Sequence, residues 1–305
     1  MFREKSLIML KKNNLFLRFL LISLCFNILT PADNDAPFGD VLLHHVTNDK
    51  SHIYIPLEIG GIDLSITKHV ILIWSISALL IILTLLGTSR YRKNKNALPS
   101  KFSGLFEVLI DFINKEMVNP NIGKKYAKRW TPLIATFFIF ILFSNFLGLI
   151  PFLEYLPGGS GTITGNFAVT GALALITFIS IIIAGSLKHG FIGHWKNMIP
   201  GGLPAPVLLI LIPVEIMGMF IKPLALLLRL GANMTAGHIG MVAIFGLPIL
   251  IGRSMGEEIG FGVGFVSVIL NTALYFLEMI VCLVQAYVFA LLSSVFIGMA
   301  IHAEH

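Results

Sequence analysis

The sequence predicts an all-α membrane protein with about five transmembrane helices, two of them a long tilted antiparallel pair, plus a cytoplasmic amphipathic helix. Hydrophobic residues make up 56% of the 305 positions and charged residues only 12%. A soluble protein carries about 25% charged residues, so a water-exposed surface could not be covered here. The mean hydropathy is +0.86. Apolar runs long enough to cross a bilayer core, which needs about 20 residues, supply the helices.

The first 30 residues are expected to form a signal peptide. Basic residues precede an apolar run at 15–29, which is short for a transmembrane helix but has the length of a signal-peptide core. An uncleaved membrane anchor is the alternative, because Arg18 interrupts the run. Residues 31–65 then form an extracytoplasmic N-terminal segment, and residues 66–305 form the polytopic transmembrane domain.

Five apolar runs predict the spans, at 66–88, 133–153, 167–187, 206–251 and 265–301. The run 206–251 would be about 70 Å long as one helix, so it must be tilted, bent or broken. Pro213, Pro223 and Pro248 offer places to bend. A tight two-helix hairpin is the rival interpretation, although no polar turn interrupts this run.

The basic residues predict the orientation of the chain. Of 22 Lys and Arg residues, ten lie between positions 89 and 131, and none lies in 154–166. Because cytoplasmic loops are enriched in Lys and Arg, the segment 89–131 is placed in the cytoplasm, and alternation brings the C-terminus there too. The net charge of +6 is therefore explained without a nucleic-acid partner.

The segment 102–118 shows helical periodicity with one apolar face. Such a helix is suited to lying along the cytoplasmic membrane surface. Packing against a partner subunit would give the same pattern, so both interpretations stay open. Elsewhere, Cys25 and Cys282 both lie in apolar segments, which excludes a disulfide framework and a Cys-based metal site. No cofactor and no metal is expected.

Ionisable and amide side chains interrupt the last two apolar runs, where each is energetically expensive and usually marks function. Residues seven apart drift only slightly around a helix, so each helix carries one polar stripe. On the first helix Asn233 follows Arg229 by four and shares its face. The members of the two stripes are Glu215, Lys222, Arg229 and Asn233 on the first helix, and Asn271, Glu278 and Gln285 on the second.

Antiparallel pairing predicts the depth of these groups. If Arg229 lies level with Gln285, helix rise brings His238 and Glu278 to similar depth on the outer side, with Glu215 near the cytoplasmic edge. An arginine stays protonated and cannot relay a proton, whereas histidine titrates near neutrality. A carboxylate can exchange a proton when burial disfavours its charged form. Mutual pairing that merely holds the helices together is the alternative.

Small residues surround the arginine. Ala232, Ala236 and Gly240 are four apart, which allows another backbone to approach closely in lipid. Ordinary helix packing would explain this strip by itself. Because the strip lies beside a buried cation, we expect something apolar to pass close to Arg229.

These residues resemble subunit a of the F-type ATP synthase, the membrane stator that faces the rotating c-ring. The resemblance runs from about 65 to 305, with two departures: Gly231-Ala232 replaces the usual Phe-Gly, and His238 and Glu278 appear in the reverse order to some bacterial relatives. The matching positions are Leu228-Arg229-Leu230, Asn233-Met234, Ala236-Gly237, Lys222-Pro223-Leu224, Gln285-Ala286, and Asn145 with Pro151.

The resemblance implies a proton-translocating stator subunit with two half-channels. It makes Arg229 the arginine essential for coupling and Asn233 and Gln285 its polar neighbours. It places His238 and Glu278 on the outer half-channel, and Glu215 on the inner one.

The implied partners are the c-subunit ring, the b-subunit peripheral stalk, the rest of the ATP synthase and the lipid bilayer of a bacterial inner membrane. No nucleic acid, no catalysis by this chain alone, and no small-molecule substrate other than protons or Na⁺ is expected. The rival functions are an ion-coupled secondary transporter and a structural membrane anchor.

Overall fold

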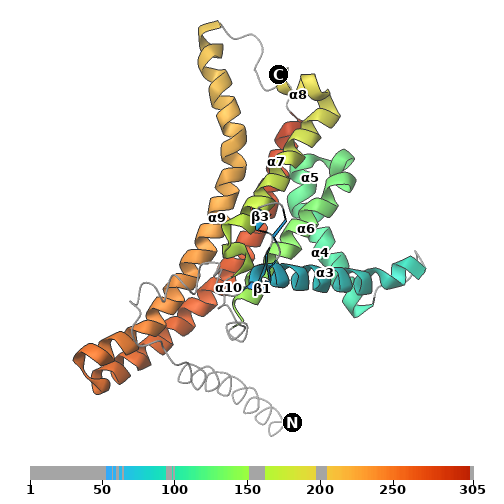
Figure 1. Ribbon diagram of the computed structural model, residues 1–305. Coiled ribbons are helices and arrows are strands. Elements are labelled where there is room, and N and C mark those ends of the chain that lie inside the picture. Colours follow the sequence, from blue (N-terminus) through green and yellow to red (C-terminus); the bar gives the residue numbers. More distant parts are fainter. Residues whose placement is uncertain are drawn as a thin grey trace. The chain divides into compact units, whose positions relative to one another are not determined.

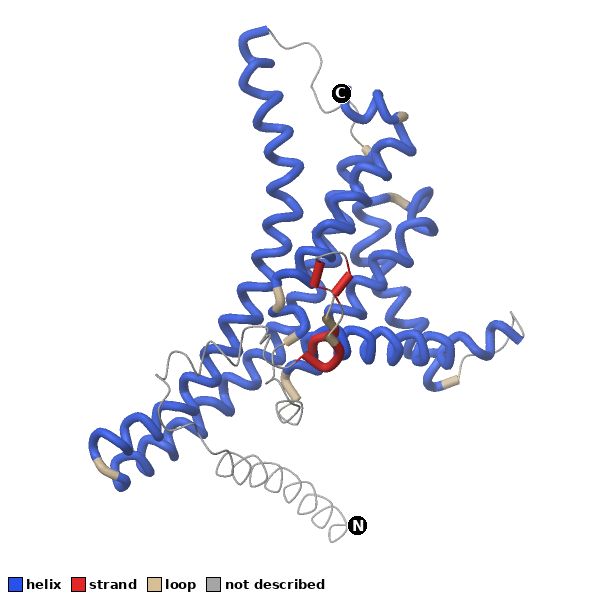
Figure 2. The backbone as a smooth tube through the Cα atoms, in the orientation of Figure 1, coloured by secondary structure: helices blue, strands red, loops and turns tan. Residues whose placement is uncertain are grey.

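The computed structural model describes residues 53–56, 58–59, 62–63, 65–93, 98, 100–150, 162–196 and 205–302. All of them belong to the unit Leu42–His305. The predicted signal peptide lies outside the described residues, as does most of the segment 31–65. Figure 1 shows the order of the elements along the chain, and Figure 2 shows that helices dominate the described residues.

Four short strands precede the first long helix, and the sequence analysis did not predict them. They form two antiparallel pairs, in which Ile53 pairs with Thr67 and Glu58 pairs with Asp63. Isoleucine is enriched in them, as expected for β-branched residues. Their bounds are β1 Ile53–Ile55, β2 Glu58–Ile59, β3 Ile62–Asp63 and β4 Ile66–Thr67.

Among the described residues, five helices are long and apolar enough to cross a membrane, which confirms the predicted fold class. The helices are α3 Lys68–Lys93, α6 Lys124–Gly148, α7 Phe167–His189, α9 Ala205–Met255 and α10 Glu257–Ile301. Shorter pieces connect them: α4 Lys101–Phe112, the π-helix η1 Ile113–Val118, α5 Asn119–Ile122, the 3₁₀ turn η3 Ile163–Gly165 and α8 Phe191–Lys196.

The long apolar run 206–251 lies within a single helix, α9. α9 continues through 51 residues with three prolines inside it, so the rival two-helix hairpin is wrong. The segment 252–264, which lies between two of the predicted spans, is helical apart from Gly256, because α9 continues to Met255 and α10 begins at Glu257. Gly256 has φ 105°, a conformation that glycine adopts without steric penalty, and the flanking polar residues are compatible with helix. One glycine therefore makes the whole turn (Figure 1).

The second span differs from its prediction at both ends. The helix α6 begins at Lys124 instead of 133 and ends at Gly148 instead of 153. Lysines are tolerated in its first turns because their long side chains carry the charge away from apolar surroundings. The helix ends before Pro151 because a proline disfavours helical backbone in the residue that precedes it.

The last helix is the centre of the packing. α10 lies against α9, α6, α7 and α5. At its C-terminal end, Ser294 Oγ donates a hydrogen bond to Met117 O at 2.7 Å, and His302 Nε2 lies 3.1 Å from Ile122 O. Gly298 fits against Asn121, where a Cβ would collide with the Asn121 carbonyl. The end of α10 thereby packs against the helical segment 117–122 of η1 and α5.

The amphipathic segment 102–118 is helical, as predicted, although its last six residues form the π-helix η1. Leu109 and Ile110 of α4 pack against the core. Leu105 and Val108 are exposed at 64% and 69%. This exposed apolar side fits a membrane surface and a partner subunit equally well.

Candidate functional site

Contacts between α9 and α10 define how the two helices are aligned. The carboxylate of Glu278 lies against Gly237, and Asn271 Nδ2 donates a hydrogen bond to Met241 O at 3.3 Å. The helices are therefore antiparallel, and continuing the same alignment places Arg229 at the level of Gln285. This agrees with the depth matching expected from the sequence, with His238 and Glu278 at one level.

The polar groups between these helices are buried. His238 is 4% exposed, Asn271 3%, Glu278 6% and Gln285 8%. The absence of a side chain at Gly237 makes room for the Glu278 carboxylate, since a Cβ there would collide with it. Within the described part of the chain, Glu278 Oε1 and Asn271 Oδ1 are buried without a hydrogen-bond partner. Buried polar atoms of this kind are rare and usually have a functional reason.

Arg229 lies on a different face of α9. Arg229 and Asn233 are exposed, as are the neighbouring Leu228, Ala232 and Ala236. The opposite face is built of fully buried apolar side chains, namely Leu226, Leu230 and Met234. A guanidinium group at membrane depth is costly when nothing compensates it, so this face has the character of a contact surface for another molecule.

The remaining predicted residues lie towards the start of α9. Glu215 is exposed and Lys222 is half-buried, so the stripe that runs from Glu215 to Asn233 stays largely uncovered. The stripe on α10, formed by Asn271, Glu278 and Gln285, is buried throughout. The fold thus brings Glu278 against Gly237, the residue before His238, and leaves Glu215 and Arg229 on the open face.

A third helix joins the buried group through Asn145 of α6. Asn145 is fully buried, its Nδ2 donates to Cys282 O at 3.3 Å, and its Oδ1 accepts a hydrogen bond from Thr164 Oγ1 at 2.5 Å. Thr235 of α9 donates to Gly165 O at 3.2 Å. The sequence analysis named Asn145 but missed Thr164 and Thr235. The sequence feature that could have pointed to Thr164 is the pair of hydroxyl residues Thr162 and Thr164, which lies just before an apolar run.

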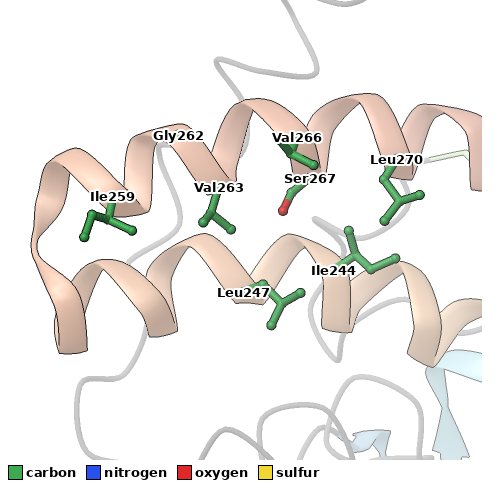
Figure 3. Close-up of a pocket in the computed structure, with 8 residues that line it drawn as sticks. All are labelled: Ile244, Leu247, Ile259, Gly262, Val263, Val266, Ser267 and Leu270. Atoms are coloured by element: carbon green, nitrogen blue, oxygen red, sulfur yellow. The ribbon is translucent and has the colours of Figure 1, made fainter.

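A cavity of about 460 Å³ lies near the turn that joins α9 and α10. Figure 3 shows its lining, which includes Ile244 and Leu247 from α9 and Ile259, Val263 and Leu270 from α10. No lining residue is ionisable, so the residues that line this cavity offer no acid or base for proton transfer. Among the described residues, no group of three or more His, Cys, Asp or Glu side chains could hold a metal ion.

The fold and the site together define a class: a multi-pass helical membrane protein whose two longest helices hold a buried acid and imidazole on one side and an uncovered arginine on the other. Comparison with known proteins gives the family. The family model described as ATP synthase A chain matches residues 70–298, and the chain belongs to this family.

Several relatives are similar over most of the chain. ATP synthase subunit a of Chloroherpeton thalassium is 38% identical, covering 86% of this chain and 77% of the relative. Subunit a of Myxococcus xanthus is 41% identical over 81% of this chain and 76% of its own length. Subunit a of Chlorobium phaeobacteroides is 36% identical over 88% and 77%. The chain is thus a membrane-sector component of an ATP synthase, in a complex with other subunits.

Proposed function

We propose that this chain is the proton-translocating stator subunit of an F-type ATP synthase, which exchanges protons with the carboxylates of the c-ring and so couples proton flow to rotation. The b-subunit peripheral stalk would hold it in place, and no cofactor is needed. Membership of the ATP synthase A chain family favours this over the secondary transporter and the structural anchor.

The observation that carries the proposal is the exposed arginine on a strip of small residues. Arg229 and Asn233 share their face with Ala232 and Ala236. Alanine side chains allow a neighbouring helix to approach closely, and the guanidinium can then reach an acid carried by that helix. When a carboxylate on that helix passes close to this strip, the fixed cation stabilises its ionised form.

The chemistry follows from the cost of charge in lipid. A ring carboxylate must be neutral while it faces hydrocarbon, because a bare charge there is too costly. Beside Arg229 its ionised form is favoured, so the proton leaves. Arg229 never loses its own proton and repels protons that would pass straight from one half-channel to the other.

The buried group between α9 and α10 supports an outer access path. His238 and Glu278 supply groups that can hold or pass a proton, and the amide of Asn271 can hydrogen-bond to water. Gln285 lies at the level of Arg229. Buried atoms left without a partner in the described part, such as Glu278 Oε1, are sites at which water binds in protein interiors. Glu215 is the matching group for an inner path, where it would accept or deliver protons.

The topology belongs to the same proposal. The basic segment 89–131 and the C-terminus lie in the cytoplasm, in a bacterial inner membrane, and residues 1–30 are removed as a signal peptide. Sequencing the N-terminus of the mature chain tests the last point: an N-terminus at Met1 would contradict it.

The decisive experiment replaces the arginine in the assembled complex. Arg229→Ala is expected to abolish both ATP-driven proton pumping in inverted membrane vesicles and ATP synthesis driven by a proton gradient. Arg253→Ala, at the far end of the same helix, is the matched control and should keep both activities. Coupled transport by Arg229→Ala at the wild-type rate would overturn the proposal.

A further inference from the structure

The start of α6 and the end of α7 carry a group of positive charges with no acid among them. The described segments 117–150 and 167–196 contain no Asp or Glu at all. The exposed cations are Lys124, Lys125, Lys128 and Arg129 from α6 and Lys188 from α7. None of the five forms an ion pair within the described residues, where the salt bridge present is Lys115 with Asp111. The proposed transport path uses none of them.

Two of these lysines converge on one aromatic ring. Lys125 Nζ lies 5.6 Å and Lys188 Nζ 5.8 Å from the centroid of the Tyr126 ring. Both are at cation–π distance, so the Tyr126 ring is a shared contact for ammonium groups from two different helices. Like charges repel. A bound anion would turn this repulsion into attraction.

The backbone at the same place also favours an anion. The helix α6 begins after Gly123, with no side-chain cap and no acidic residue in its first turn. Gly123 O accepts hydrogen bonds from the N–H groups of Tyr126 and Ala127, whereas the first N–H groups of any helix have no partner within it. The N-terminus of a helix carries partial positive charge, which adds to that of the lysines. Together with the lysine pair, this gives two independent features that an anion would satisfy.

The adjoining surface is apolar and uncovered. On α7 the residues Leu175, Ile179, Ile183 and Leu187 are exposed at 45–56%, and their spacing places them in one row along the helix. The row ends beside Lys188. The 25 residues of α6 extend roughly 37 Å, longer than a hydrocarbon core of about 30 Å. Lys124 and Lys125 at its first residues therefore reach the headgroup level.

From this arrangement we infer that the start of α6 and the end of α7 form a binding site for an anionic phospholipid. The phosphate of the headgroup lies between Lys125 and Lys188, beside the ring of Tyr126. The acyl chains lie along the row of Leu175, Ile179, Ile183 and Leu187. Basic pockets between transmembrane helices are a known mode of recognising anionic headgroups. The site requires that the helices span a membrane, and it does not depend on the role of Arg229.

The test uses the full chain in its ATP synthase complex, reconstituted in phosphatidylcholine with a photoreactive phosphatidylglycerol. Crosslinks located by mass spectrometry should fall on the segment 175–188. Lys125→Gln with Lys188→Gln should weaken labelling about 30-fold, since each lysine near an anionic surface contributes about fivefold. If the double variant fails to assemble, Lys188→Gln alone should weaken labelling about fivefold.

The matched control removes the same charge elsewhere. Lys101 and Lys115 are exposed, and a hydrogen bond to Asp111 raises the pKa of Lys115. The double variant Lys101→Gln with Lys115→Gln should label like the wild type. Tyr126→Phe, which keeps the ring, should label normally, and Tyr126→Leu should label less.

Three results would overturn the inference. In the first, the control weakens labelling as much as the Lys125 and Lys188 variant, which would indicate general surface charge. In the second, glycerol 3-phosphate or inorganic phosphate competes as well as unlabelled phosphatidylglycerol, so that a free anion is the ligand. In the third, the variant loses a partner subunit while its lipid labelling is unchanged, so that the site binds an acidic protein segment.

Discussion

Two regions of α9, only nine residues apart, keep their polar side chains in opposite surroundings. Arg229 is exposed, whereas His238 is 4% exposed and follows Gly237, which lies against Glu278 of α10. Nine residues make about two and a half helical turns, so the two side chains point to opposite sides of the helix. The buried side belongs to the chain's own packing, and the exposed side is left for another molecule.

This difference separates two ways in which a substitution can fail. A change on the buried side disturbs packing and hydrogen bonding, so both stability and transport suffer. A change on the exposed side leaves the chain intact and affects only what it contacts. Stability and transport measured on the same variants therefore distinguish the two regions.

The largest effect on transport is expected from a substitution on the exposed face of α9. Ala232→Trp puts a large ring beside Arg229, so a close neighbour cannot approach, and ATP-driven pumping should fall to background. The free energy of unfolding of the chain should change by less than about 0.5 kcal/mol, as at other surface positions. ATP-driven pumping in membrane vesicles tests the expected loss of transport. Denaturation of the purified chain tests the expected stability. Pumping at the normal rate would show that nothing passes this face.

On the buried side, Glu278→Gln removes the group that titrates while keeping its size. We expect passive proton flux to fall about 100-fold, in the range found when an acid–base group is lost. Asn145→Ala should slow flux only a few-fold but lower the free energy of unfolding by about 1 kcal/mol, because it loses its bonds to Thr164 and Cys282. Equal effects of the two variants on flux would argue against the outer path.

Gly237 and Gly240 form a matched pair on α9. An added methyl group at Gly237 collides with the Glu278 carboxylate, whereas nothing lies within 4 Å of one at Gly240. Gly237→Ala should destabilise the chain by about 1–3 kcal/mol, the usual range for overpacking, and slow proton flux. Gly240→Ala should be neutral or slightly stabilising.

A shortened acid provides the internal check on Gly237. Adding Glu278→Asp to Gly237→Ala should recover part of the lost stability, because the carboxylate is withdrawn from the new methyl group. No recovery, or an equal loss of stability in Gly240→Ala, would contradict the steric explanation. Thermal denaturation in a single detergent measures all three variants.

The smallest effect on transport is expected at the turn between α9 and α10. A Cβ at Gly260 would lie 2.6 Å from Gly252 Cα, whereas Gly262 has open space. Gly260→Ala should lower the free energy of unfolding by about 1–2 kcal/mol, and Gly262→Ala should not. Transport should change less than about twofold in either, since Gly252 lies roughly 35 Å along the helix from Arg229. A large loss of pumping in Gly260→Ala alone would mean that the turn takes part in transport.

Composition and periodicity were sufficient for much of the fold. Apolar runs predicted all five spans, because membrane crossing is decided by length and hydropathy. The seven-residue spacing of Asn271, Glu278 and Gln285 predicted one face of α10, and that face is buried. The depth matching of His238 with Glu278 also agrees with the contact at Gly237.

Other features depend on contacts between distant parts of the sequence. The partnership of Asn145 with Thr164 and Cys282 joins three separate segments, and no local pattern encodes it. The one-residue turn at Gly256 was missed because Arg253 and Glu257 look like loop residues, although both are compatible with helix. The opposite surroundings of Arg229 and His238 could have been predicted, because a separation of nine residues places two side chains on opposite sides of a helix. The prediction used only the depth of the two residues in the membrane.

The packing of α10 against the helical segment 117–122 has a consequence for how the protein is made. The helix at the centre of the packing leaves the ribosome after α6, α7 and α9, because it follows them in the chain. Until it arrives, α6, α7 and α9 have no central partner, and Met117 and Ile122 lack the surface that buries them. A chain shortened before Ser294 would lose the hydrogen bonds of Ser294 and His302. Synthesis of α10 is therefore the step that closes the bundle, and a chain that lacks α10 exposes the surfaces that this helix buries.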